Sequence, residues 1–445
     1  MDSELLARVA SHVSTYLEYA QTRHVAPRSP ELSHFETPFP DAALDAEGIL
    51  AELTQWGAPG SMINTGGRFF GFVNGGILPG ALVGSWVASA WDQNSGMAVS
   101  SPIGAKLEQV ALRWVVEALH LPNECGGGLV TGATMANFSG LLAARHALLE
   151  RAGWDVERHG LFGAPAIDVV VGDEVHTSVL KALSMAGFGR ERVTRIPVDG
   201  QGRMKADQLP PLTDRSLVLI QAGNVNSGAF DPAEEICAQA HKAGAWVHVD
   251  GAFGLWAAAS PRYRWLTKSF DQADSWATDG HKWPNAGYDC GIVIVREPKH
   301  LSAAMTARAA YLTTNSDRDP MDFTPELSRR ARGIELWSAL RTLGREGLAA
   351  LVERCCGHAQ RFAAGFREEG YEVLNDVVIN QVMVSFGAPD RTLDVIRRIQ
   401  ADGTCWASST VWQGRTAMRI SVSSWATSEH DVELSLAAIL RIAKA

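Results

Sequence analysis

Residues 245–250 read AWVHVD, an apolar and β-branched run that ends in a carboxylate. Four similar runs lie around it: AIDVVVG (166–172), RVTRIPV (192–198), SLVLIQAG (216–223) and GIVIVRE (291–297). Such runs are typical of strands buried on both faces of a sheet. Helix-like stretches separate several of them. Strands that alternate with helices predict right-handed crossovers, and therefore an α/β domain with a mostly parallel sheet.

The flanking parts of the chain have other patterns. Residues 1–60 predict an amphipathic helix, a Pro-rich extended arm and a second helix. Residues 61–297 would form the α/β domain. Residues 298–445 contain a long helical stretch near 334–367, then strand-like runs and a closing helix, which predict a smaller α+β domain.

The composition excludes several classes of protein. The chain has 445 residues, of which 46% are hydrophobic and 20% charged, as in globular proteins with large cores rather than disordered or coiled-coil chains. A net charge of −9 disfavours general binding to nucleic acid, which needs a basic surface. The six cysteines form no CxxC pair, so we expect reduced thiols in a cytoplasmic protein and no metal site.

One uncharged stretch, residues 69–91, is long enough to span a bilayer. It contains five glycines and a proline, which keep its hydrophobicity modest. A buried segment or a subunit interface is favoured over a membrane role. The first residues, MDSELLARVA, show no secretory signal.

Two residues that could carry chemistry lie at the end of one expected strand and just before another. Lys282 lies in DGHKWPN (279–285), among apolar and aromatic residues. Most lysines are solvated, but one in this setting can lose its proton and attack a carbonyl to form a Schiff base. Asp250 ends its run, where a buried carboxylate needs a partner. It could form a structural ion pair or a helix N-cap, or it could pair with a protonated ring nitrogen.

Two further signals come from His176 and from Gly132-Ala133-Thr134. His176 follows a strand, where it could be structural, stack on a planar ligand or handle a proton. The Gly-Ala-Thr triplet precedes a helix; it is either ordinary capping or an anion cradle. Together the four signals supply what pyridoxal 5′-phosphate requires: an anion cradle, a ring stacker, a carboxylate for the ring nitrogen and an attachment lysine.

The order of these motifs is similar to that in the group II pyridoxal-phosphate-dependent amino-acid decarboxylases, the family of aromatic-L-amino-acid and glutamate decarboxylases. The motifs are TGATMAN (131–137), DEVHTSVLKA (173–182), GNVNSGAFDP (223–232), HVDGAFG (248–254) and DGHKW (279–283). The resemblance implies fold-type I, with a seven-stranded, mostly parallel sheet. It also implies a homodimer with active sites at the subunit interface and an amino acid as substrate.

The same resemblance assigns roles to individual residues. Lys282 would attach the cofactor covalently, Asp250 would pair with its ring nitrogen, and His176 and Ala252 would cover the two faces of the ring. The phosphate would be held by Gly132, Ala133, Thr134 and His281, with Asn224 also near the cofactor. The substrate would contact Arg419 through its carboxylate, and Phe72, Trp91, Ser101 and Phe323 through its side chain.

The implied reaction is loss of CO2 from the substrate Cα, followed by protonation of that carbon to give an amine. Many family members protonate Cα with a loop tyrosine. Here the only tyrosine of the corresponding loop is Tyr311, at its start, and Phe323 lies nearer the expected place. Because a phenyl ring donates no proton, oxygen-dependent conversion to an aldehyde stays open beside simple decarboxylation. Transamination and a non-catalytic scaffold are further alternatives, and the uncharged pocket residues favour an aromatic or neutral amino acid.

Overall fold

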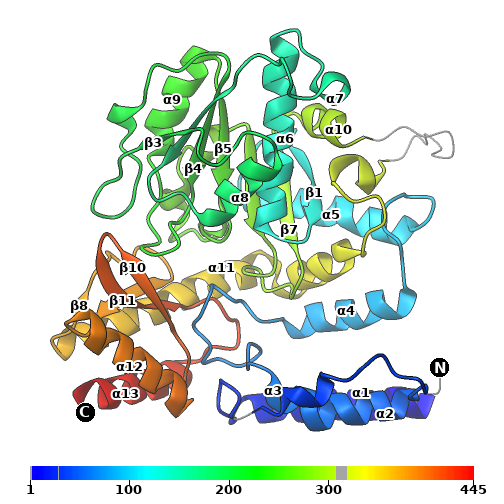
Figure 1. Ribbon diagram of the computed structural model, residues 1–445, viewed down its shortest axis with the longest axis vertical. Helices are drawn as coiled ribbons and strands as arrows, with labels where there is room; N and C mark the ends of the chain where they lie inside the picture. The colour runs from blue at the N-terminus through cyan, green and yellow to red at the C-terminus, as the bar shows by residue number, and fades with distance from the viewer. Residues whose placement is uncertain (1–2, 29, 307–317) are drawn as a thin grey trace. The chain divides into compact units, whose positions relative to one another are not determined.

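The computed structural model describes residues 3–28, 30–306 and 318–445 (Figure 1). The chain forms two compact units. Unit 1 comprises residues 1–76, 358–374 and 382–445, and unit 2 comprises residues 77–357 and 375–381. The three-part division at residues 60 and 297 stays a prediction. The unit boundaries lie at other positions, one of them inside a helix.

Unit 2 contains a seven-stranded sheet in the order β1-β7-β6-β5-β4-β2-β3. From β3 to β6 the neighbouring strands are parallel, whereas β7 runs antiparallel to both β6 and β1. This confirms the mostly parallel seven-stranded sheet. The strands are β1 (Gly126–Val130), β2 (Asp168–Gly172), β3 (Val193–Ile196), β4 (Ser216–Gln221), β5 (Trp246–Asp250), β6 (Ser275–Asp279) and β7 (Gly291–Val295).

Both faces of this sheet are buried at its centre. Val169 and Val171 of β2 pack in one apolar cluster with helices α6 (Ala133–Arg151) and α8 (Thr177–Met185). Val170, between them, points to the opposite face and is also buried. The edge strand β3 differs: its central residues are exposed, so the expectation of burial on both faces is wrong there.

Unit 2 has further helices, and several of them lie against the sheet (Figure 1). These further helices are α4 (Pro79–Trp91), α5 (Pro102–Ala118), α7 (Val156–His159), α9 (Ala233–Ala243) and α10 (Pro298–Met305), with short 3-10 turns η3 (Ala206–Gln208), η4 (Gly254–Ala259), η5 (Arg264–Thr267), η6 (Phe270–Gln272) and η7 (Pro320–Phe323). The long expected helix is α11 (Arg332–Glu368). It is interrupted at Gly344, whose positive φ of 60° favours glycine.

Unit 1 combines N-terminal helices with a small four-stranded sheet in the order β10-β11-β9-β8. Asp45 caps α2 by accepting a hydrogen bond from the Gly48 N–H at 2.8 Å. The elements are α1 (Ser3–Ala20), η1 (Leu32–Phe35), α2 (Ala46–Glu52), the π-helical turn η2 (Leu53–Gly57), α3 (Ala58–Gly60), β8 (Glu372–Val373), β9 (Gln381–Ser385), α12 (Pro389–Asp402), β10 (Ser408–Trp412), β11 (Arg415–Ser421) and α13 (Glu429–Lys444).

The uncharged stretch 69–91 includes helix α4, which begins with Pro79 in its first turn. Within the described ranges, no helix is both long enough and apolar enough to cross a bilayer. All six cysteines are free thiols, and five of them are buried.

Candidate active site

The predicted site residues of unit 2 follow the carboxyl ends of its parallel strands. β5 ends at Asp250 and β6 ends at Asp279. His176 caps the helix that follows β2, and Lys282 lies three residues beyond β6. Because these strands are parallel, their carboxyl ends share one edge of the sheet, where ligands bind in open α/β folds.

Asp250 is a buried carboxylate at this edge, near the charged groups of His176 and Lys282. Its side chain is buried, and Oδ1 accepts a hydrogen bond from the Ala252 N–H at 3.3 Å. Burial raises the pKa of Asp250, while His176 and Lys282 act in the opposite direction through their charges. The structure therefore brings three of the predicted residues within electrostatic reach of one another.

Asn137 of α6 was not singled out from the sequence, although it ends the motif TGATMAN. It is fully buried, and its Oδ1 lies 2.9 Å from Nε2 of His248. The other ring nitrogen of His248 lies 2.7 Å from the Ser275 hydroxyl. The Asn137 amide also favours the charged form of Asp250. Asn137 thus connects α6 to the carboxylate that is expected to face the cofactor ring.

The Asp279 carboxylate lies at the start of helix α6. The Ala133 N–H donates a hydrogen bond of 2.6 Å to Oδ1 of Asp279. A Cβ on Gly132 would meet His281 at 3.3 Å, so glycine keeps this end of the helix open. The first helical N–H groups and the helix dipole make such an end suitable for a phosphate. Asp279 is the second residue that the sequence reasoning missed.

Lys282 is held by the same carboxylate. Its Nζ lies 2.8 Å from Oδ2 of Asp279, and Nε2 of His281 lies 3.5 Å from that oxygen. Asp279 is only 2% exposed at its side chain. The arrangement places the lysine ammonium, an imidazole and the start of α6 around one buried carboxylate.

His281 is fixed on both sides. Its Nδ1 accepts a hydrogen bond from the Cys290 N–H at 3.4 Å, and its ring stacks on Tyr288 with centroids 4.4 Å apart. Burial lowers the pKa of His281, which favours the neutral ring. Partial burial and the nearby Asp279 raise the pKa of Tyr288, although the residue is 59% exposed, so this phenol keeps its proton at neutral pH. Tyr288 was also missed from the sequence.

His176 has its ring orientation set by the helix that it caps. Its Nδ1 lies 2.7 Å from the Ser178 hydroxyl and accepts from the Ser178 N–H at 3.2 Å. Asn224 is hydrogen-bonded to its own loop and to Glu174. Its Oδ1 accepts from the N–H groups of Asn226 and Ser227, and its Nδ2 donates to Glu174. A cofactor contact of Asn224 stays a prediction.

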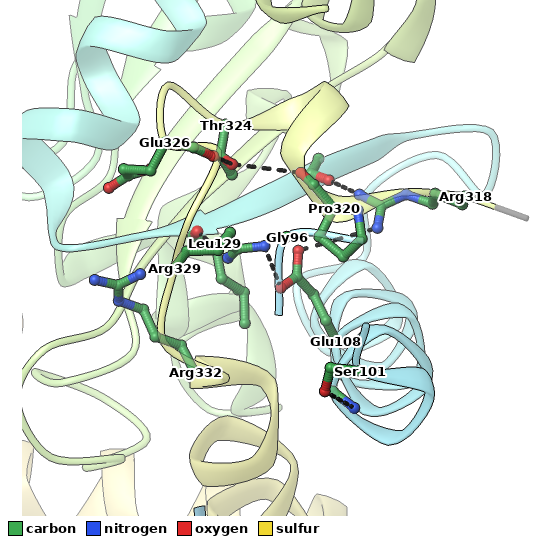
Figure 2. Close-up of polar contacts among 12 residues, drawn as sticks. Gly96, Ser101, Glu108, Leu129, Arg318, Pro320, Thr324, Glu326, Arg329 and Arg332 are labelled. Carbon is green, nitrogen blue, oxygen red and sulfur yellow. Dashed lines mark hydrogen bonds and ion pairs between the residues drawn. The ribbon is translucent and has the colours of Figure 1, made fainter. Parts of the chain in front are cut away.

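The predicted substrate residues are distributed over both units. Ser101 is buried and caps α5, accepting the Gly104 N–H at 3.3 Å, as Figure 2 shows. Trp91, at the end of α4, is 48% exposed. The Phe323 ring lies under the Arg318 guanidinium, 4.1 Å from it, beside β1. Tyr311 lies outside the described residues.

Phe72 and Arg419 belong to unit 1. Phe72 is 59% exposed, and its ring lies 5.3 Å from that of Trp406. Arg419 lies on β11, paired in register with Ser408, and burial lowers the pKa of its guanidinium. Their substrate roles stay predictions.

The residues of unit 2 fit pyridoxal phosphate. An anion already occupies the first N–H of α6, a lysine amine lies beside it, and a buried carboxylate with His176 and Lys282 in its field lies at the same sheet edge. These are the parts that the cofactor's phosphate, aldehyde and ring nitrogen require.

Residues 30–387 match the pyridoxal-dependent decarboxylase conserved domain. The chain belongs to this family. As a pyridoxal-dependent decarboxylase it is a carboxy-lyase, and its cofactor is pyridoxal phosphate. The family predicted from the motifs is therefore confirmed.

Several relatives of this decarboxylase are named for aromatic chemistry. Tryptophan decarboxylase 1 of Oryza sativa subsp. japonica is 27% identical over 86% of this chain and 80% of its own. Aromatic-L-amino-acid decarboxylase of Drosophila lebanonensis is 28% identical over 76% and 88%, respectively. Phenylacetaldehyde synthase of Arabidopsis thaliana is 23% identical over 86% and 82%.

The fold of this decarboxylase is also found in solved structures. The crystal structure of Oryza sativa TDC with PLP and tryptamine superposes with a TM-score of 0.91. It is 24% identical, and the match covers 99% of this chain and 97% of that one. This likeness confirms the expected fold.

Proposed function

We propose that this decarboxylase converts an aromatic or neutral L-amino acid to the corresponding amine and CO2. The observation that carries the proposal is the grouping of Lys282, Asp250 and His176 at one edge of the sheet, with Lys282 beside the open start of α6. A scaffold protein would have no need for a buried carboxylate in the field of a lysine and a histidine.

Each of these residues has a role toward the cofactor. Lys282 provides the amine for covalent attachment, and Asp250 pairs with the ring nitrogen. The first N–H groups of α6, Thr134 and His281 hold the phosphate, while His176 and Ala252 cover the ring. When bound, pyridoxal phosphate withdraws electrons from the substrate Cα, so that its bond to the carboxylate can break. His176 is oriented by Ser178, and Tyr288 keeps its proton near neutral pH.

The substrate class is supported by the relatives and by the predicted pocket. The relatives include tryptophan and aromatic-L-amino-acid decarboxylases. Phe72, Trp91, Ser101 and Phe323 carry no charge, which suits an aromatic or neutral side chain better than a carboxylate. Arg419 would then meet the α-carboxylate of the substrate.

A second reaction is supported by one residue and one relative. Phe323 stands near the expected position of the proton-donating tyrosine, and phenylacetaldehyde synthase is among the relatives. An aldehyde-forming enzyme would consume O2 and release CO2, ammonia and H2O2.

The experiment is a panel of amino acids with detection of CO2, amine, aldehyde and H2O2. We expect CO2 and amine without peroxide from an aromatic substrate. Equal amounts of CO2 and peroxide would establish aldehyde formation instead, and an oxo acid without CO2 would contradict both reactions. We expect no peroxide from the wild type and no gain in peroxide from Phe323→Tyr. If the wild type does form peroxide, a large fall in Phe323→Tyr would show that residue 323 determines the outcome.

Lys282→Ala provides a prediction that is independent of the substrate. We expect borohydride reduction of the cofactor-loaded wild type, followed by peptide mapping, to place the label on Lys282. Lys282→Ala should bind the cofactor without covalent attachment and lose decarboxylation by at least about a thousandfold, as expected when a nucleophile is removed. Lys268→Ala, an exposed lysine paired with Glu234, is the matched control and should behave as wild type. A label on another lysine would contradict the assignment.

We also infer a homodimer. Residues 1–60 expose many large apolar side chains, among them Leu6, Tyr19, Phe39 and Leu53. We propose that these side chains form part of the dimer interface, since exposed apolar patches mark interaction surfaces. A cytoplasmic location is proposed with it, supported by the six free thiols.

A further inference from the structure

Two histidines and a glutamate converge in unit 2 near the C-terminal end of α6, the opposite end from the candidate phosphate site. His146 and Glu150 lie on α6, four residues apart and therefore on one face of the helix. His300 lies on α10, which packs beside α6 (Figure 1). One ligand atom from each of the three residues lies within 4.8 Å of the others.

The distances suit coordination better than hydrogen bonding. Oε2 of Glu150 lies 3.6 Å from Nε2 of His146 and 3.8 Å from Nδ1 of His300. Both distances are too long for hydrogen bonds. Two ligand atoms bound tetrahedrally to Zn2+ at about 2.0–2.1 Å are about 3.3 Å apart. The three ligand atoms lie within 4.8 Å of one another, so coordination requires the Glu150 carboxylate and the two imidazole rings to move closer together.

His300 supplies an independent observation. The residue is only 8% exposed, yet its Nδ1 is buried without a hydrogen-bond partner among the described residues. A buried polar atom without a partner is unfavourable, and native structures rarely leave one so. This nitrogen points toward Glu150, at the position that a bound cation would satisfy.

His146 also has a carboxylate at its other ring nitrogen. Nδ1 of His146 lies 2.8 Å from Oε2 of Glu157, whereas Nε2 of His300 lies 4.0 Å from Oε1 of Glu297, which is too far for a hydrogen bond. With Nδ1 of His146 donating to Glu157, the neutral ring has its lone pair on Nε2, the atom nearer Glu150. Carboxylates behind ligating histidines are the usual outer shell of zinc sites. Trp246 packs edge-on against the His300 ring and helps to fix its orientation.

We propose that His146, Glu150 and His300 form a binding site for a divalent transition-metal ion of the Zn2+ type. Two imidazoles and one carboxylate are ligands that suit Zn2+, and they leave a fourth position for water. The ion would join α6 to α10. Glu157 would orient the His146 ring.

The probe is Zn2+ added to the full-length, cofactor-loaded enzyme after treatment with a chelator. Calorimetry should show one saturable site per chain, and Zn2+ should raise the melting temperature. His300→Ala and Glu150→Gln should each lose this binding and the thermal shift, while Glu157→Gln should weaken binding by about tenfold. His241→Ala removes an exposed histidine of α9 and is the matched control, with wild-type binding expected.

The proposal is overturned if the wild type shows no saturable Zn2+ site or if Glu150→Gln and His300→Ala bind Zn2+ as the wild type does. Glu150 is 60% exposed at its side chain, so its replacement by glutamine is not expected to disturb folding. The cofactor absorbance of each variant checks that the fold is intact. None of these measurements depends on catalytic activity, so they stand apart from the proposed function.

Discussion

Single residues explain both the success and the limit of sequence reasoning at this site. Asp250 and His176 were predictable because each lies at the end of a strand-like run, and Lys282 because it lies among apolar and aromatic residues just before one. Asp279 and Asn137 were missed because their importance arises from neighbours far along the chain. Asp279 bonds to Ala133, and Asn137 bonds to His248, more than 100 residues away in each case.

Asp279 gives a prediction at this scale. Its carboxylate occupies the first N–H of α6 and pairs with Lys282, so it competes with the phosphate and with attachment of the cofactor. We expect Asp279→Asn to bind pyridoxal phosphate about tenfold more tightly, which corresponds to about 1.4 kcal/mol. The measurement is an absorbance titration of the apoenzyme. Asp173→Asn, an exposed site with the same change in charge, is the control; weaker binding by Asp279→Asn would show that the carboxylate supports the cofactor.

His248 gives a prediction about pH. Burial lowers the pKa of His248 to about 3, against about 6.5 in the unfolded chain. Below about pH 6.5 the unfolded chain binds a proton at His248 and the folded chain does not, which favours unfolding. The contribution of His248 to the free energy of unfolding is therefore fully present above about pH 6.5 and is lost as the pH falls toward 3. We expect a loss of about 2 kcal/mol by pH 5 from this residue. His248→Gln, which can still donate to Asn137 and accept from Ser275, should show a correspondingly smaller loss of urea-unfolding free energy between pH 7 and pH 5; parallel curves would contradict the assignment.

At the scale of elements, the sequence predicted five of the seven strands of the large sheet and missed β1 and β6. β1 reads GGGLV, and three glycines carry little strand propensity. β6 reads SWATD, a mixed run without clear alternation. Both become strands because β7 lies between them and pairs with each one. Such pairing is a tertiary effect that local patterns do not contain.

Helix α5 is joined to the segment before α11 by a buried ion pair. Oε2 of Glu108 lies 2.7 Å from Nη1 of Arg329, and both side chains are fully buried (Figure 2). Arg329 also donates to the Leu129 carbonyl of β1, and Arg318 lies 4.0 Å from the other Glu108 oxygen. The pair therefore connects α5, β1 and the chain that precedes α11.

We expect Glu108→Gln to lower the free energy of unfolding by about 3–5 kcal/mol, because it leaves the Arg329 charge buried without a partner. The measurement is urea unfolding. Glu117→Gln is the control on the same helix: its carboxylate also lies 2.7 Å from an arginine, Arg345, but both side chains are exposed. Its loss should stay below about 1 kcal/mol. Similar losses for the two variants would contradict the role assigned to burial.

At the scale of the whole molecule, the family and the reaction type could be inferred from five motifs, since their order is distinctive. The assembly could not be inferred from patterns alone, because apolar residues of an isolated helix look the same whether they pack inside the chain or on a second copy. Several apolar side chains of residues 1–60 are left exposed by the rest of the single chain. Leu6 on α1 and Leu53 in η2 are 51% and 55% exposed.

We therefore expect Leu6→Glu combined with Leu53→Glu to convert the proposed dimer to a monomer. Two buried leucines contribute about 3–6 kcal/mol to an interface, and buried carboxylates would add a desolvation penalty, so the dissociation constant should rise at least about a hundredfold. Light scattering after size exclusion, over a range of protein concentrations, measures the change. His12→Glu combined with Gln55→Glu adds the same charge at exposed polar positions of the same elements and should remain dimeric. If the wild type has the mass of a single chain at every concentration, the apolar side chains of residues 1–60 serve another purpose and the proposed dimer is wrong.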